Sequence, residues 1–413
     1  MSRTHARSRP SPATRRKRAA LPPRPKKRRP ARARLSAEWL QLEVLHARAA
    51  KEWAELAERA LEPNVFLEPG FAIAAARHLE ADSVGAIAVW SGGRLVGLLP
   101  GRVEGVRSGR PISTFVAWVH PFALLSTPLV DRSAPADVIR TMLKALKRVP
   151  GAPRLALFPL LAEAGPVAQA IGAALARKRR GATRFMPYAR AALFPAGEGG
   201  TAALSAKRLA ELRRQQRRLA EAGTVERVTA KSLKEVEPAL AAYFDLEAAG
   251  WKGRAGSAAK TDGDSAKFFR EAVLALAAER KAQIDLLRLD GRAIAASITL
   301  FSGDRAWGWK TAYDETFARF SPGMQLMFDL SQKLGEDGQL SLVDSCAAPG
   351  GGIVDHMWPG RIAMADWLVP LEDGVSFNIG VAAERARRAA IASAKKLRDL
   401  VRGLLKNFFD PRL

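Results

Sequence analysis

Four side chains in the second half of the chain could move protons during a group-transfer reaction. Asp344 follows a short apolar stretch, and His356 is the only histidine of that half. Glu247 lies one turn before a glycine-containing loop, and Tyr313 ends an alternating apolar segment. A carboxylate or imidazole can accept the proton of an attacking amine, and a tyrosine can protonate a leaving thiolate. Capping, solvation or packing would explain each residue equally well.

Other chemistries lack the residues they need. Cys346 is the only cysteine, so it can form no internal disulfide, and it is more typical of a small buried hydrophobe than of a nucleophile. The sequence contains no metal-ligand spacing, P-loop or dinucleotide-binding fingerprint. We therefore expect no metal and no nucleotide-hydrolysing or redox-cofactor site of those kinds.

The net charge of +25 is concentrated at the N-terminus. Residues 1–34 hold 14 Lys or Arg and no acidic residue, together with many Pro and Ala. This composition predicts a disordered basic tail, and contact with nucleic acid or anionic lipid is the alternative. The remaining residues carry 52 basic and 41 acidic groups, or +11, which suits a polyanionic ligand such as coenzyme A or transfer RNA.

Hydrophobic segments are too short to cross a bilayer as a helix. No apolar run approaches the roughly 20 residues that a membrane span requires, and the basic tail lacks the apolar core of a signal peptide. The single cysteine is consistent with a reducing compartment. We expect a soluble, cytoplasmic protein of bacterial origin.

The elements that must position these residues occur in the same order twice. In the first half we expect helices at 37–61 and 69–79, strands at 84–91, 94–106 and 112–118, a helix at 135–147, a strand at 155–160, a helix at 163–176 and a strand at 185–194. In the second half we expect a strand at 225–228, helices at 232–249 and 264–280, strands at 284–289, 293–301 and 306–313, a helix at 323–334, a strand at 340–343, a short helix at 354–358 and a strand at 362–369.

This order is that of the GNAT acyltransferase fold. Its repetition predicts an α/β (α+β) protein with tandem GNAT-like domains, each a mixed, mostly antiparallel sheet flanked by helices. The expected parts are the tail 1–34, an N-terminal domain 35–200, a basic linker helix 201–223, a C-terminal acyltransferase domain 224–380 and a basic amphipathic helix 381–413.

The expected donor site lies where the last meander strand separates from the next strand. Pantetheine amides can pair with the exposed strand, and a pyrophosphate can bind the N-terminus of the following helix. The strand would contribute Trp309, Lys310 and Thr311, and the helix start would contribute Ser321, Pro322, Gly323 and Met324. Ser321 can cap, Pro322 suits the first helical position, and Gly323 permits close approach of a phosphate. An ordinary helix start is the alternative. The first half lacks such a glycine at 131–135, so we expect no active site there.

Several stretches resemble the BioF2-like or CelD-like acetyltransferase family, a GNAT-superfamily group related to the Fem-type aminoacyl transferases. They are NVFLEPGF, LSAKRLAELRRQQRRLAEAG, EAAGWKGRAGSA, WKTAYDETFARFSPGMQLMFDL, LVDSCAAPGG and HMWPGR. The resemblance spans residues 65–369 and is concentrated after Leu204. It implies a tandem GNAT fold and N-acyl transfer, often in envelope or exopolysaccharide metabolism. Where many members carry a lysine, this chain has His356.

Two cationic helices and one loop could contact substrates or surfaces. The predicted helix 204–222 exposes a basic face that includes Arg213 and Arg214, which fits a solvated linker or a track for transfer RNA. Trp251 and Lys252 lie in the loop between the first two helices of the second half, where they could line a substrate cleft. In the segment 381–409 one side is apolar and eight Lys or Arg occupy the others, so it could pack on the domain or lie on a membrane surface.

Three functions remain open at this point. The first is an N-acyltransferase that moves an acyl group, most simply acetyl, from acyl-CoA to a small-molecule or glycan amine. The second is a Fem-type ligase that uses aminoacyl-tRNA. The third is a binding protein with degenerate sites in both halves.

Overall fold

The computed structural model describes residues 34–80, 84–195, 197, 200–250, 263–348, 350 and 352–408. The predicted tail 1–34 falls almost entirely outside the described residues. The first half comprises β1 (Leu35–Gln41), α1 (Leu42–Glu58), α2 (Pro69–Leu79), β2 (Gly85–Ser91), β3 (Arg94–Glu104), β4 (Thr114–Ala117), β5 (Leu129–Val130), α3 (Pro135–Leu146), β6 (Leu155–Ala162), α4 (Pro166–Ala176) and β7 (Thr183–Leu193).

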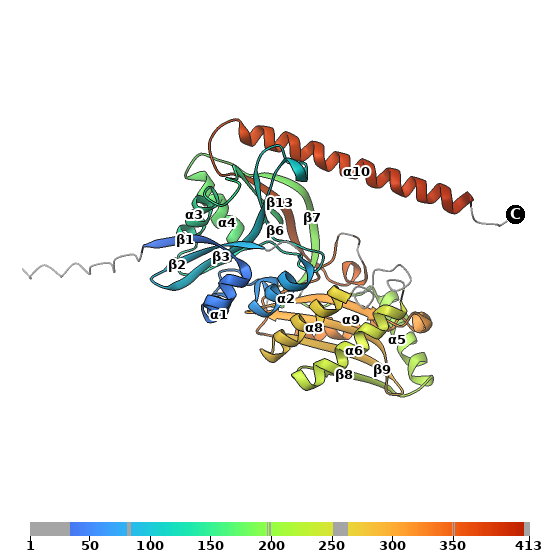
Figure 1. Ribbon diagram of the computed structural model, residues 1–413. Coiled ribbons are helices and arrows are strands. Elements are labelled where there is room, and N and C mark those ends of the chain that lie inside the picture. Colours follow the sequence, from blue (N-terminus) through green and yellow to red (C-terminus); the bar gives the residue numbers. More distant parts are fainter. Residues whose placement is uncertain are drawn as a thin grey trace, which may run out of the picture. The chain divides into compact units, whose positions relative to one another are not determined.

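The second half repeats this order after a connecting helix, α5 (Ala206–Glu221). Its elements are β8 (Val225–Ala230), α6 (Leu233–Ala249), α8 (Gly263–Ala278), β9 (Ala282–Leu289), β10 (Arg292–Ser302), β11 (Arg305–Tyr313), the 3-10 turn η3 (Glu315–Phe320), α9 (Pro322–Gly335), β12 (Leu342–Asp344), η4 (Ile353–His356) and β13 (Gly360–Pro370). A long helix, α10 (Ser376–Phe408), follows (Figure 1). The predicted fold class is confirmed, and the domain boundaries stay a prediction.

The strands of the described residues form one sheet that runs through both halves. The order is β1-β2-β3-β4-β6-β13-β7-β12-β11-β10-β9-β8, and β5 pairs with β3 off this path. Among the strands of the described residues, only β4–β6 and β11–β12 are parallel pairs. The order is symmetric about the β13–β7 pair, where each half lends its last strand to the other: β13 pairs with β6, and β7 pairs with β12. Each exchanged strand remains covalently part of its own half and is hydrogen-bonded to a strand of the other half.

The duplication extends to individual hydrogen bonds. At the end of β5, Asp131 accepts bonds from the backbone N–H and hydroxyl of Ser133 at 2.9 and 2.7 Å. Its other oxygen accepts a bond at 2.9 Å from Arg94, the first residue of β3. The second half repeats this cluster with Asp314, Thr316 and Arg292. The two clusters share an Asx turn and an arginine at the start of the neighbouring strand, so the halves correspond in these hydrogen bonds as well as in element order.

One predicted element is wrong at its start. The helix expected at 37–61 begins only at Leu42, because Leu35–Gln41 forms an edge strand paired with β2. Ala, Glu and Leu in this segment favour a helix locally, but pairing with β2 overrides that preference. The packing explains the choice: Trp39 lies over Gly85, where a Cβ atom would come within 1.9 Å of the indole ring.

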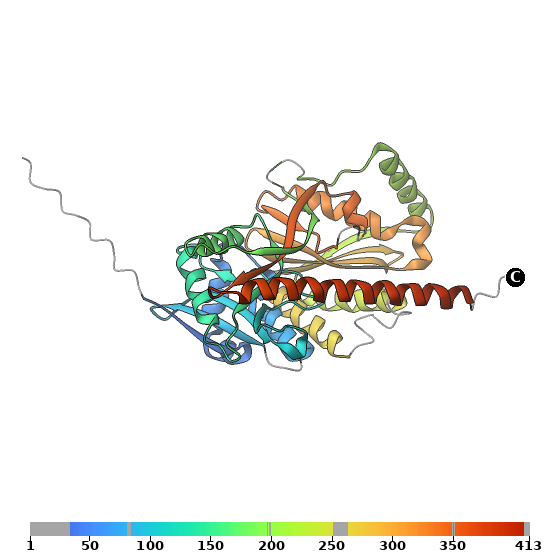
Figure 2. The ribbon, with the colours of Figure 1, turned by 90° about the horizontal axis from the view of Figure 1, so that it is seen from above.

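The halves share a core on one side of the sheet. Helices α2 and α8 cross closely at Gly70, where a Cβ atom would lie 2.7 Å from that of Ala275. Phe71 from the first half meets Phe268 and Trp309 from the second, with ring centroids 5.2 and 5.6 Å apart. In the second half, helix α9 covers the opposite face of the sheet from α6 and α8 (Figure 2). The region around β11 is therefore enclosed by both halves.

Candidate functional site

Strand β11 separates from its parallel neighbour after three residues. Pairing between the strands covers only 305–307 of β11 and ends at Trp307 and Asp344, whereas β11 runs on to Tyr313. In the described part of the chain, its later residues pair on the β10 side alone. Trp309 is the extra residue of a bulge, because Gly308 pairs with Thr299 and Lys310 pairs with Ile298. A fork and a bulge of this kind expose backbone groups to which an extended ligand can pair.

The start of α9 differs from the expectation in one respect. Pro322 occupies the first helical position as predicted, but Ser321 does not cap the helix with its side chain. Ser321 instead adopts the left-handed conformation (φ 50°, ψ 51°), which is uncommon and costly for a residue other than glycine. Among the described residues, no acceptor receives the backbone N–H groups of Gly323 and Met324. Two donors at a helix N-terminus suit a phosphate.

Gly323 also makes room for a neighbouring ring. A Cβ atom at this position would lie 3.3 Å from Cδ1 of Tyr313, tighter than ordinary side-chain contact. The absence of a side chain therefore serves the packing of Tyr313 against the helix start. Tyr313 and the free N–H groups consequently belong to one corner of the second half.

Helix α5 brings positive charge to the same corner. Leu219 on α5 packs with Phe320 and Leu326, which flank the start of α9. Arg213 is exposed on the helix, and Arg214 is half-buried in an ion pair with Glu211. The arrangement makes α5 a cationic wall beside the α9 N-terminus.

Asp344 is buried and ion-paired, not open to a cleft as the sequence suggested. Its Oδ2 accepts a bond from Arg190 at 3.0 Å, and its Oδ1 accepts one from the backbone N–H of Cys346 at 2.8 Å. Arg190 also donates to the hydroxyl of Tyr188 at 2.6 Å. Burial disfavours the charge on Arg190, but Asp344, Cys346 and Tyr188 outweigh that effect and raise the pKa of Arg190. To act as a base, Asp344 would first have to break its ion pair with Arg190.

A segment of the first half, 118–128, covers the bulge of β11. The indole of Trp309 donates a bond to the carbonyl oxygen of Phe122 at 2.9 Å. The Phe122 ring lies 4.7 Å from the Nζ atom of Lys310 and also packs against Phe269. The segment thus forms one wall of the fork.

His120 in this segment is buried without a hydrogen-bond partner for either ring nitrogen among the described residues. The rings of Phe71, Trp118 and Phe268 surround it. Burial, and secondarily the nearby ammonium group of Lys310, lowers the pKa of His120 to about 3. His120 is therefore neutral throughout the physiological range.

Two of the four predicted proton-moving residues do share a cleft. Glu247, Thr311 and Tyr313 line a cleft between the end of α6 and the end of β11. Glu247 is buried and accepts a hydrogen bond from the hydroxyl of Tyr243 at 3.0 Å. A buried carboxylate and a tyrosine on one cleft are suited to acid–base work.

The remaining predicted residues lie elsewhere. His356 is exposed at the end of η4. Trp251 and Lys252 lie outside the described residues. Sequence reasoning missed Arg190 and His120, because both belong to the first half and reach the fork only through the strand exchange and the segment 118–128. Neither residue sits in a motif that could have identified it.

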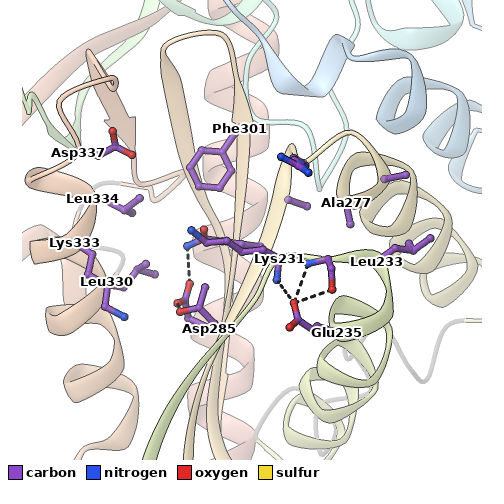
Figure 3. Close-up of a pocket in the computed structure, with 16 residues that line it drawn as sticks. Lys231, Leu233, Glu235, Ala277, Asp285, Phe301, Leu330, Lys333, Leu334 and Asp337 are labelled. Atoms are coloured by element: carbon purple, nitrogen blue, oxygen red, sulfur yellow. Dashed lines mark hydrogen bonds between the residues drawn. The ribbon is translucent and has the colours of Figure 1, made fainter.

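A second groove in this half lies around Asp285 on β9, next to the start of α6 (Figure 3). Asp285 accepts bonds from Thr229 at 2.6 Å and Gln283 at 2.9 Å, and burial raises the pKa of its carboxyl group. Lys231 and Lys333 line the rim. Among the described residues, none of those predicted for donor or acceptor binding lines this groove.

Comparisons with known proteins agree with the fold of the second half. Residues 206–351 match the acetyltransferase (GNAT) domain family, from the start of α5 to the loop after β12. The chain therefore carries a GNAT acetyltransferase domain and is an acyltransferase. No curated protein matches the sequence.

Solved structures resemble the chain over most of its length. The C-terminal domain of a candidate lysylphosphatidylglycerol synthetase from Agrobacterium fabrum aligns with a TM-score of 0.52 and 14% identity, over 84% of this chain and 96% of that one. FemX aligns with a TM-score of 0.48 and 11% identity over 81% and 96%. A tandem GNAT protein from the clavulanic acid biosynthesis pathway gives 0.40 and 16% over 83% and 100%. The Agrobacterium domain shows a shared fold.

Proposed function

We propose that this acyltransferase moves an acyl group, most simply acetyl, from acyl-CoA to an amine, and that only its second half binds the donor. The observation that carries the proposal is the forked strand β11 beside the uncapped start of α9. The backbone of β11 beyond Trp307 would pair with the pantetheine amides, and the N–H groups of Gly323 and Met324 would bind the pyrophosphate. The cationic face of α5 would attract the phosphates.

The amine would approach from the side that the first half builds. The segment 118–128 covers the bulge of β11, and the Glu247 cleft lies at the end of the same strand. The acceptor class we propose is a small molecule or glycan amine, in line with the resemblance to the BioF2-like or CelD-like family. Arg190 and Asp344 would hold the floor of the fork rigid as an ion pair.

The chemistry then needs one base and one acid. The amine nitrogen attacks the thioester carbonyl carbon, a C–N bond forms, and the C–S bond breaks. Glu247 would accept the proton that the nitrogen loses, and Tyr313 would donate a proton to the departing sulfur. The backbone around the Trp309 bulge would donate to the carbonyl oxygen as negative charge develops on it.

Calorimetric titration of the full-length protein with acetyl-CoA and longer acyl-CoAs tests the donor assignment. We expect saturable binding of at least one of them. If neither heat nor a thermal shift accompanies any member of the panel, the donor is not acyl-CoA. Glu247→Gln tests the base: kcat should fall by on the order of 100-fold while acyl-CoA affinity stays unchanged. A matched variant, Glu237→Gln on the exposed side of the same helix, should retain kcat.

A second candidate uses aminoacyl-tRNA as the donor, and the exposed arginines of α5 favour it. A transfer RNA would contact phosphates along Arg213, Arg217 and Arg218, which are exposed. Binding of charged transfer RNA would then fall steeply with salt concentration, whereas acyl-CoA binding would be absent. Titrating both ligands at two salt concentrations separates the candidates.

A further inference from the structure

The long helix α10 is anchored to the first half through one face of its first turns. Phe377 and Val381 pack in a cluster with Leu155 and Leu368. The buried carboxylate of Glu384 pairs with Arg110, Arg387 and Arg388. Burial disfavours the charge on Glu384, but the three guanidinium groups outweigh it and lower the pKa to about 2. The start of α10 is thus fixed by apolar packing and ion pairs.

Beyond the anchor the helix continues with its side chains exposed. Every side chain from Ala389 to Arg398 is exposed, and the helix runs on without a break to Phe408 (Figure 1). Ten consecutive exposed residues mean that the helix presents all of its faces to the surroundings. A helix of this length needs a reason to stay folded away from a core.

The face opposite the anchor carries an apolar stripe. Ile379 and Leu397 are 48% and 62% exposed. Ala386 and Ala390 lie between them, and the spacings of 7, 11 and 18 residues keep all four within about 40° on the helix, at 100° per residue. Phe377 and Val381 point to the other side. The same spacing continues in the sequence at Val401, Leu404 and Phe408.

Positive charge borders this stripe. Lys396 and Arg398 lie about 100° to either side of Leu397, and Lys395 lies on the back of the helix. Residues 389–408 hold five basic residues and one acidic residue, Asp399, which gives 5 − 1 = +4. An apolar stripe flanked by cations is the pattern of a helix that lies in a lipid interface.

We propose that α10 binds the surface of an anionic phospholipid bilayer, with the stripe from Ile379 to Leu397 turned toward the acyl chains and the flanking lysines and arginines toward the lipid phosphates. Charge complementarity selects this occupant. A second copy of the same helix would bring +4 against +4, which disfavours self-association. The inference goes beyond acyl transfer, because it requires no donor or acceptor. Within the described residues no helix is long and apolar enough to span a bilayer, so contact of α10 would be peripheral.

Vesicle co-sedimentation of the full-length protein tests the proposal. The wild type should bind vesicles of phosphatidylcholine mixed with phosphatidylglycerol and should not bind phosphatidylcholine alone. Lys396→Glu/Arg398→Glu should weaken binding by about tenfold or more, because both residues flank the stripe and each reversal opposes the anionic surface. Leu397→Glu should weaken it by about tenfold through the apolar face. Lys234→Glu, an exposed reversal on α6, is the matched control and should bind as the wild type does.

Two outcomes would overturn the proposal. If both α10 variants bind vesicles as tightly as the wild type does, the contact lies on another surface. The basic residues 1–34, which every variant retains, are one such surface. A wild-type dimer in sedimentation velocity that Leu397→Glu converts to monomer, with no vesicle binding by either protein, would make the stripe a contact between copies. The circular dichroism spectra of the variants should match that of the wild type, because Leu397 is exposed. Such a match excludes misfolding as the cause of either outcome.

Discussion

The two halves share the same arrangement of elements, and each departs from it at a different place. Both have the Asx turn and arginine pair at Asp131 and Asp314, and both have a bulge two residues into the strand that starts with the arginine. The first departure follows β4. Where β11 inserts the single bulged residue Trp309, the first half leaves the sheet for residues 118–128 and returns as β5.

The second departure precedes the central helix. From Asp131 the first half reaches Pro135 directly, whereas from Asp314 the second half adds the turn η3 and the left-handed Ser321 before Pro322. The second helical position is Ala136 in α3 and Gly323 in α9. The second half has thus enlarged the loop that would hold phosphates, while the first half has enlarged the loop that covers its partner's bulge. In the function that we propose, the second half binds the donor and the first half encloses the site.

The largest expected effect is on stability. It compares two buried carboxylates, Asp344 at the fork of the second half and Asp131 in the first half. Arg190→Met leaves Asp344 buried and unpaired, so the free energy of unfolding should fall by about 3–5 kcal/mol. In the first half Arg59→Met leaves Asp131 with Arg94 and Ser133, and the loss should be about 1–2 kcal/mol. Urea denaturation measures both. Equal losses of unfolding free energy in the two variants would mean that the Arg190–Asp344 pair stabilises the fold no more than the Arg59–Asp131 pair does.

The next effect is on donor affinity. Gly323→Val would push the Tyr313 ring away and block access to the free N–H groups of α9, so acyl-CoA affinity should fall on the order of 100-fold. Ala136→Val occupies the same helical position in the first half, is exposed, and should leave affinity unchanged. Calorimetric titration of the two variants with acyl-CoA measures both affinities. A comparable loss in both variants would place the donor in both halves.

The third effect is a pH dependence that the first half imposes through His120. The pKa of this histidine is about 3 in the folded chain and near 6.5 in the unfolded chain. Above pH 6.5 both states are neutral and the residue contributes no pH dependence. Below it only the unfolded chain binds a proton, so the free energy of unfolding should fall by roughly 2 kcal/mol from pH 6.5 to 5.

His120→Phe should remove this slope, because phenylalanine fits the aromatic surroundings and does not titrate. Phe122→Leu in the same segment is the control: it should lower stability at every pH and keep the slope. Urea titrations at pH 5, 6 and 7 would reveal a persistent slope in His120→Phe, which would assign the acid sensitivity to other groups.

The smallest effect distinguishes the charged helices of the two halves. Arg213→Glu on α5 should weaken acyl-CoA binding by about threefold at low salt and by less at high salt, since the charge is exposed and screened. Arg140→Glu on α3 of the first half should have no effect on binding. A loss that is independent of salt would indicate a direct contact of Arg213 instead of long-range attraction.

Much of the fold was predictable because local signals and tertiary packing agree. The Gly92-Gly93 and Asp290-Gly291 turns, the capping box of Ser232 and the apolar periods predict the meanders and helices. The edge strand β1 was not predictable, because its residues favour a helix and only pairing with β2 makes it a strand. The strand β11 and the helix start at Pro322 were predictable because each is encoded by contiguous residues, and the donor site there stays a prediction. Ser321 failed as a cap because the turn η3 ends in the left-handed region at that residue.

The sequence by itself determined the order of elements in the two halves, and it predicts a donor strand and helix in the second. Each element rests on a short local pattern of apolar and turn residues, which local backbone preferences can encode. Only the tertiary structure decided that β7 and β13 change places, that Arg190 pairs with Asp344, and that residues 118–128 form one wall of the fork. Those contacts join residues more than 150 positions apart, and their free energy comes from burial and pairing that no local pattern records.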